Sequence, residues 1–165
     1  MSNDPSSDIA PNVPAGERVI HVTGTVHVPM ACPQAFELFT PHGERAWAHG
    51  WNPLYPAPTP DDSVPGTVFQ IVHGAERATW VVCQCETGRS IQYARVLPGT
   101  HAGTISVILH GDDSTCVATV EYRLTALTDE AAHQLHHFAA HYPAFLREWE
   151  VAIARVYGGS DVGSL

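Results

Sequence analysis

Hydrophobic and polar residues alternate in six stretches of the chain, and this period of two predicts six β-strands. The first stretch reads RVIHVTGTVHV, where Ile20 and Val22 alternate with polar side chains. Alternation in the last stretch places Val120, Tyr122 and Leu124 on one face. Glycine-containing turns separate the later stretches, which favours consecutive hairpins in an antiparallel meander. The predicted strands cover residues 18–28, 67–73, 77–86, 89–97, 103–110 and 116–126.

The chain between the first two strands predicts two short helices followed by a loop. Residues 33–40 begin with a proline, which favours a helix start, and Cys32 is the expected N-cap. Thr40 and Pro41 can open a second short helix that runs to about Trp47. Residues 48–66 hold five prolines and are expected to form a loop.

Beyond the strands, residues 128–157 repeat apolar side chains at steps of three and four, which predicts one long amphipathic helix. Thr128 is a favourable N-cap, and the glycine pair that starts at Gly158 ends the pattern. Pro143 lacks an amide hydrogen and is expected to kink the helix. The apolar stripe contains Leu135, Phe138, Ala139, Tyr142, Phe145, Leu146, Trp149, Ile153 and Val156.

This order of elements predicts an α+β domain, because the meander and the helix each need the other to bury an apolar face. A strongly bent sheet wrapped on one helix leaves a gap between them. The polar, proline- and serine-containing residues 1–17 are expected to be a disordered tail. Residues 18–158 form one predicted domain, and residues 159–165 a flexible tail.

Several short segments, taken in order, resemble the SRPBCC superfamily, whose START-like domains have a helix-grip fold, in a largely uncharacterised bacterial branch. The resemblance covers about residues 18–157. It implies a curved antiparallel sheet of six strands, or seven, around a long C-terminal helix, with a cavity between them. Known members bind lipids, sterols or polyketides, cyclise polyketides, or activate a chaperone ATPase, and they share no catalytic set. The segments are FELFTP at 36–41, GERAW at 43–47, GW at 50–51, TWVV at 79–82, IQY at 91–93, PG at 98–99 and YRLTAL at 122–127.

Composition and charge narrow the classes of partner. The net charge is −9, which disfavours binding to nucleic acid or to an anionic membrane surface. The chain has no lysine, so a Schiff-base lysine and a phosphate-loop lysine are excluded. No apolar run is long enough for membrane insertion, and the N-terminus lacks the features of a secretory signal. We therefore expect a cytoplasmic protein whose four cysteines, Cys32, Cys83, Cys85 and Cys116, are reduced thiols.

The predicted inner faces supply candidate ligand-binding residues. Aromatic side chains with polar tips suit a site that holds an apolar body and orients it by a few hydrogen bonds. Val82, Ile91, Val120 and Leu124 are expected on the same faces, and a completely filled core is the alternative. Arg95 either faces an anionic ligand or lies near the strand end and reaches water. The candidates are Trp47, Trp51, Trp80, Tyr93, Arg95, Tyr122, Phe138 and Tyr142.

Two further groups of residues carry candidate chemistry. Glu44 and His49 could serve as acid and base at the rim of a pocket, whereas Trp47 and Trp51 beside them could merely fix the short helix to the sheet. His133, His137 and His141 share one helix face at metal-binding spacing. They point away from the apolar stripe, so we expect solvated histidines with neither a metal nor another cofactor.

Three hypotheses about function follow. The leading one is a binding protein for a small apolar, lipid-like or aromatic ligand. The second is an enzyme of the polyketide cyclase or dehydratase kind, with Glu44, His49, Tyr93 or Tyr122 as acid–base groups. The third is an interaction module like a chaperone activator, which an exposed apolar patch far from the cavity would support. The sequence leaves the ligand and the oligomeric state open.

Overall fold

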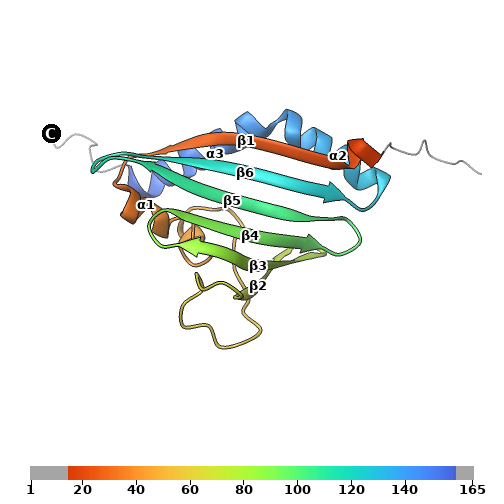
Figure 1. The fold of residues 1–165 in the computed structure, drawn as a ribbon, viewed down its shortest axis with the longest axis horizontal. Helices are drawn as coiled ribbons and strands as arrows, with labels where there is room; N and C mark the ends of the chain where they lie inside the picture. Colours follow the sequence, from red (N-terminus) through yellow and green to blue (C-terminus); the bar gives the residue numbers. More distant parts are fainter. Residues whose placement is uncertain (1–14, 159–165) are drawn as a thin grey trace, which may run out of the picture.

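The computed structural model describes residues 15–158, and its strands follow the predicted pattern (Figure 1). The predicted tails fall mostly on residues 1–14 and 159–165, outside the described part. Residues 15–17 of the predicted N-terminal tail belong to a 3-10 turn, Ala15–Arg18. The strands are β1 Val19–Val28, β2 Val68–His73, β3 Glu76–Glu86, β4 Ser90–Leu97, β5 His101–Gly111 and β6 Cys116–Ala126.

The six strands form one antiparallel sheet in the order β1-β6-β5-β4-β3-β2. Consecutive hairpins join β2 to β6, and β1 returns to pair with β6 from Val19↔Thr125 to Val28↔Cys116. The predicted meander and the α+β fold class are confirmed. The strand β5 begins at His101, two residues earlier than predicted, and this difference brings His101 onto the inner face.

Two C-terminal helices, α2 Asp129–Ala140 and α3 Tyr142–Tyr157, lie across one face of the sheet, beside β1 and β6 (Figure 1). The helix α3 approaches β1 at Gly24, where an added Cβ would lie 2.5 Å from Cδ1 of Leu146. The helices therefore cover the β1 half of the concave face, and the inner face of β3 to β5 is left for other elements to close.

The prediction of one continuous helix over 128–157 was wrong at its centre. The helix α2 begins as expected, since the Thr128 hydroxyl accepts a hydrogen bond from the Ala131 amide at 3.1 Å. It ends at His141, and α3 begins anew with a proline in its first turn. Because Pro143 has no amide hydrogen, the backbone hydrogen bonds cannot run through this point, and the predicted kink is a break.

The segment after β1 also differs from the prediction. The short helix α1 spans Cys32–Glu37, and its N-cap is Ala31 rather than Cys32. The Thr40 hydroxyl donates to the Glu37 carbonyl at 2.9 Å and accepts from the Gly43 amide at 3.0 Å, which turns the chain sharply. The second short helix, expected from Thr40 to about Trp47, is a four-residue 3-10 helix, Gly43–Ala46.

The expectation of four reduced thiols was wrong for two of them. Cys32 and Cys116 form a disulfide with a Cα–Cα distance of 5.0 Å, because the start of α1 lies against the first residue of β6. Cys83 and Cys85 are free. The register of β3 shifts between Val82 and Gln84, so Cys83 is an extra residue on that strand.

Candidate functional site

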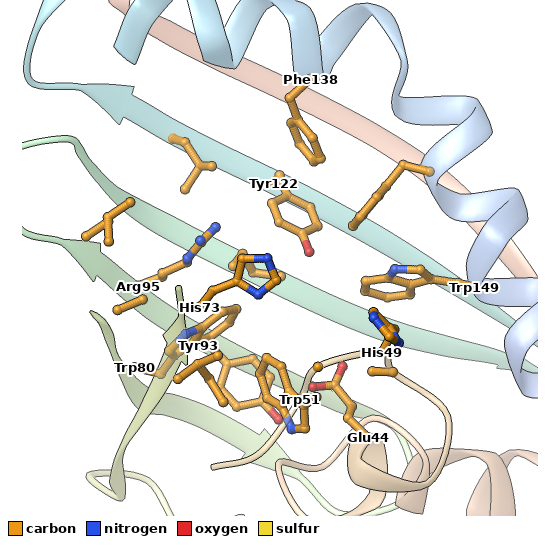
Figure 2. Close-up of a pocket in the computed structure, with 18 of the residues that line it drawn as sticks. Glu44, His49, Trp51, His73, Trp80, Tyr93, Arg95, Tyr122, Phe138 and Trp149 are labelled. Atoms are coloured by element: carbon orange, nitrogen blue, oxygen red, sulfur yellow. The ribbon is translucent and has the colours of Figure 1, made fainter. Parts of the chain in front are cut away.

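A cavity of about 600 Å³ lies between the inner face of the sheet and the two C-terminal helices. Figure 2 shows side chains from the strands, the helices and the segment 44–51 converging on it. Residues of the lining that are exposed to solvent form the mouth of the cavity, and the more buried residues form its walls. The mouth residues are His49, Gly50, His73, Glu76, Gln134 and Glu148.

The sheet wall is formed by inward-facing residues of β3 to β6. Trp80 and Tyr93 pack edge to face with ring centroids 5.6 Å apart, and Phe69 stacks on Trp80 from β2. The Tyr93 hydroxyl donates to the Phe39 carbonyl at 2.8 Å, so its polar tip is used inside the protein. The Tyr122 hydroxyl has no such partner among residues 15–158, and burial raises the pKa of Tyr122 far above its usual value.

The helix wall is a row of aromatic rings. Phe138, Phe145 and Trp149 follow one another at the helical spacing that the sequence predicted, with neighbouring centroids 5.1 Å and 5.3 Å apart. Tyr122 reaches this row from β6, 5.2 Å from Phe138. Each contact is of the tilted or edge-to-face kind that aromatic pairs favour. The three helix side chains are half-buried because one side of each ring faces the cavity.

The third wall is the segment 44–51, and its two tryptophans both fix the segment and line the cavity. The Trp47 indole donates to the Leu38 carbonyl and the Trp51 indole to the Pro41 carbonyl, each at 2.8 Å. Trp47 also contacts Trp149 at 5.2 Å, which closes the wall onto α3. The two alternative roles considered for these residues are therefore compatible.

Glu44 is the carboxyl group of this wall, and it is only 8% exposed. Among residues 15–158, no side chain or amide donates a hydrogen bond to its carboxyl group. Burial raises the pKa of Glu44 well above its ordinary value, because the charged form is poorly solvated there. Figure 2 shows its carboxyl group directed toward the cavity, while His49 lies at the mouth.

Arg95 is the cationic group of the lining. Its guanidinium lies over the Trp80 ring, 5.3 Å from the centroid, and its Nε atom is buried without a hydrogen-bond partner. His101 adjoins it with a buried, unpartnered Nε2 atom. Burial, together with the charge of Arg95, lowers the pKa of His101 to about 4, so the imidazole is neutral at pH 7.

Seven of the eight predicted ligand-binding residues line the cavity, and their role in binding stays a prediction. The exception is Tyr142, whose hydroxyl donates to the Val120 carbonyl at 2.6 Å and which packs outside the lining. Val82, Ile91 and Val120 were also expected to face a gap but are packed in the core. Val82 and Ile91 lie on β3 and β4, away from the β1 edge that α3 covers, so elements other than α3 close this part of the inner face.

His101 and Phe145 are among the lining residues that were not predicted as site residues. His101 shares its period-two face with Ile105 and Val107, so extending the predicted strand by two residues would have identified it. Phe145 was placed on the apolar stripe, but nothing in that pattern separates the rings that face the cavity from those that fill the core.

The histidines of α2 lie away from the cavity. His133, His137 and His141 are exposed, and His137 stacks near His141 with centroids 4.2 Å apart. Within the described part of the chain, no three His, Cys, Asp or Glu side chains are placed to hold a metal ion.

No protein-family model matches the chain, and no curated protein matches it. Solved structures do. DynU16, a protein of the dynemicin biosynthetic locus, matches with a TM-score of 0.55 and 16% identity over 86% of this chain, which spans 48% of DynU16. Norcoclaurine synthase from Thalictrum flavum, in complex with dopamine and hydroxybenzaldehyde, matches with a TM-score of 0.59 and 9% identity over 88% of this chain and 90% of its own. The Aha1 dimer from Colwellia psychrerythraea matches with a TM-score of 0.57 and 12% identity over 85% of this chain and 98% of the Aha1 chain.

The architecture defines an α+β protein in which a curved sheet grips C-terminal helices around an internal cavity. The structural matches identify this architecture as the helix-grip fold, and the resemblance to SRPBCC domains drawn from the sequence is confirmed at the level of the fold. Between residues 15 and 158, no helix has the length and apolar character needed to cross a membrane.

Proposed function

We propose that this protein binds a small, largely apolar molecule with aromatic or lipid-like character in the cavity between the sheet and the helices. The observation that carries the proposal is the cavity itself. Its volume of about 600 Å³ falls within the range of roughly 300–1,000 Å³ that is usual for ligand sites. Aromatic rings contribute to all three of its walls, and the polar side chains of Glu44, Arg95 and His101 lie among them.

The chemistry of the lining supports an apolar body with few polar groups. Trp80, Phe138 and Trp149 offer ring faces and edges to a ligand without needing a change of conformation. The carboxyl group of Glu44 and the guanidinium of Arg95 have no hydrogen-bond partner among residues 15–158, so a ligand can bind them. In the related fold of norcoclaurine synthase, the bound molecules are aromatic, dopamine and hydroxybenzaldehyde.

A thermal-shift screen against hydrophobic compounds tests the proposal. A ligand at about 100 times its dissociation constant adds about 2.7 kcal/mol to the free energy of unfolding. For a chain of this size the expected rise in Tm is roughly 5–10 °C. Quenching of tryptophan fluorescence should follow the same dissociation constant, because four tryptophans border the cavity. A panel of fatty, steroidal and polycyclic aromatic compounds that shifts neither signal would contradict the proposal.

An enzyme of the dehydratase or cyclase kind is the second candidate, and Glu44 is the observation that favours it. A carboxyl group whose pKa is raised by burial is a better proton donor near neutral pH than an exposed one, and it can donate its proton to a leaving hydroxyl group. The hydroxyl leaves as water, a base such as His49 takes the proton from the neighbouring carbon, and a carbon–carbon double bond forms. This candidate stands second because His49 is exposed at the mouth rather than enclosed with Glu44.

The variant Glu44→Gln separates the two candidates. Glutamine keeps the shape of the side chain and removes its acidic proton. If the protein dehydrates a β-hydroxy ketone, mass spectrometry should show loss of water with the wild type and a rate lower by roughly 100-fold or more in the variant. If the protein only binds, neither form releases water, and both bind the ligand. Glu37→Gln, on an exposed residue of α1, is the matched control.

The interaction-module hypothesis stays a prediction. Apolar residues are exposed on α3, with Val151 at 47% and Val156 at 50%, but charged Arg147 and Arg155 lie on the same helix surface. This arrangement favours neither a partner nor a particular oligomeric state.

A further inference from the structure

Arg95 stands out in the cavity because its charge is not matched by the protein. The residue is half-buried on β4, its Nε atom is sealed from solvent, and its guanidinium is stacked on Trp80. Among residues 15–158, no carboxylate lies within ion-pair distance of it. Removing a guanidinium from water without a partner is costly, and buried arginines are normally paired.

The groups around Arg95 leave a net positive charge at this end of the cavity. His101 is neutral at pH 7 because its pKa is lowered to about 4. Tyr122 is neutral at pH 7 as tyrosines ordinarily are, and burial raises its pKa further. Glu76 is the carboxylate whose charge acts on Arg95, but it is exposed at the mouth and forms no ion pair. Glu44 lies on the wall formed by the segment 44–51, burial raises its pKa, and it forms no ion pair with Arg95.

The geometry leaves the tip of the guanidinium available to a ligand. Figure 2 shows the Arg95 side chain directed into the cavity, with Tyr122 and Phe138 beyond it. The contact with the Trp80 ring restricts where the planar group can lie. A carboxylate can accept two parallel hydrogen bonds from such a fixed fork, and these charge-assisted bonds are stronger than neutral ones.

We propose that the cavity selects amphipathic carboxylic acids, whose carboxylate binds Arg95 and whose apolar body lies against Trp80, Tyr122 and Phe138. This inference rests on the proposed function and specifies its ligand class. A ligand carboxylate supplies the missing counter-charge, and the aromatic walls accommodate a ring system or an alkyl chain.

Matched pairs of compounds test the inference. We would measure the binding of 2-naphthylacetic acid and its primary amide by calorimetry at pH 7, and likewise of decanoic acid and decanamide. Each pair has nearly the same shape and differs in charge. The wild type should bind each acid at least about tenfold more tightly than its amide, the size of one charge-assisted hydrogen bond.

Three variants locate the preference. Arg95→Gln should abolish the preference for acids. The affinity for the acid should fall, while the affinity for the amide should change by less than about threefold. Arg95→Lys should keep part of it, because lysine retains the charge but lacks the planar fork. Arg123→Gln is the control, since Arg123 is an exposed arginine on the outer side of β6 and its loss changes the net charge equally. That variant should behave like the wild type.

The outcomes separate this inference from the proposed function. If the amides bind as tightly as the acids, or if the preference survives in Arg95→Gln, the ligand class is wrong while the binding function stands. If neither member of any pair binds, and no neutral hydrophobic compound does, both fail. Thermal unfolding of each unliganded variant checks the fold. If Arg95→Gln does not fold, the acid–amide difference in the wild type and in Arg95→Lys decides the question.

Discussion

At the scale of single residues, burial sets the charge of the cavity by acting in opposite directions on two groups. It raises the pKa of the Glu44 carboxyl and lowers that of the His101 imidazole, because in both cases the charged form is the one that loses solvation. The His101 imidazole is consequently neutral near pH 7, and the charged form of Glu44 is disfavoured. Arg95 cannot follow them, since a guanidinium keeps its proton throughout the accessible pH range.

The His101 imidazole should make stability depend on pH in a defined window. Its pKa is about 4 in the folded protein and about 6.5 when unfolded, so between these values the unfolded state binds more protons. Stability is then fully present above pH 6.5 and is lost as the pH falls toward 4. We expect His101→Gln to remove this loss, which is on the order of 2 kcal/mol, in urea unfolding at pH 4.5 and 7.5.

The control for this measurement is His110→Gln, which removes an exposed histidine from the same strand and should follow the wild-type profile. If the wild type and His101→Gln lose the same stability between pH 7.5 and 4.5, the ring is not held neutral by its surroundings. Glutamine is polar, uncharged and close to the imidazole in size, so unfolding of the variant at pH 7.5 should resemble that of the wild type.

At the scale of elements, the contact between β1 and α3 depends on Gly24. An added Cβ would lie 2.5 Å from Leu146 Cδ1 and 3.3 Å from Tyr142 Cε1, both on side chains that are nearly fully buried. Gly24→Val should therefore push the helix from the sheet and lower the free energy of unfolding by about 2 kcal/mol in chemical denaturation. Thr25 is the next residue and is exposed, so Thr25→Val should lower the free energy of unfolding far less. Equal losses in both variants would contradict this account of the packing.

The disulfide joins α1 to the start of β6 across 84 residues of sequence. Closing so long a loop restricts the unfolded chain, so Cys116→Ser should lower the free energy of unfolding by roughly 2–4 kcal/mol. Alkylation of the denatured protein without reductant should label two thiols, those of Cys83 and Cys85. Labelling of all four cysteines would show that the pair is reduced. The cytoplasmic location stays a prediction, and disulfides are more typical of oxidising compartments.

The elements themselves could be predicted from local patterns, because strands and amphipathic helices are marked by period and by their terminating residues. The six strands could be predicted from the alternation of apolar and polar residues and from the glycine-containing turns between them. The errors arose where a tertiary contact decides the outcome. Cys32 pairs with Cys116, a residue far along the chain. No local pattern carries that information.

At the scale of the whole molecule, the sequence predicted which side chains face inward but not where the space between them lies. The inner face of the sheet carries both Val82 and Val107. Val82 on β3 packs into the core, while Val107 on β5 borders the cavity. The difference arises from which elements, far apart in the sequence, pack over each part of the sheet, and no local pattern specifies this.

These two valines provide a test of the cavity that needs no knowledge of the ligand's chemistry. Both are buried, with exposures of 0% and 3%, and a phenylalanine adds the same volume at each position. At Val107 the added ring can enter the cavity, so Val107→Phe should keep the wild-type stability to within about 1 kcal/mol. At Val82 the ring meets close-packed neighbours, and Val82→Phe should lower the free energy of unfolding by about 1–3 kcal/mol.

The two variants should affect ligand binding in the opposite order. Val107→Phe should weaken the affinity at least about tenfold, and Val82→Phe should leave it unchanged. Calorimetry with the tightest-binding compound of the panel measures both. Equal destabilisation by both variants would mean that the inner face is filled throughout, and the binding function would then lose its physical basis.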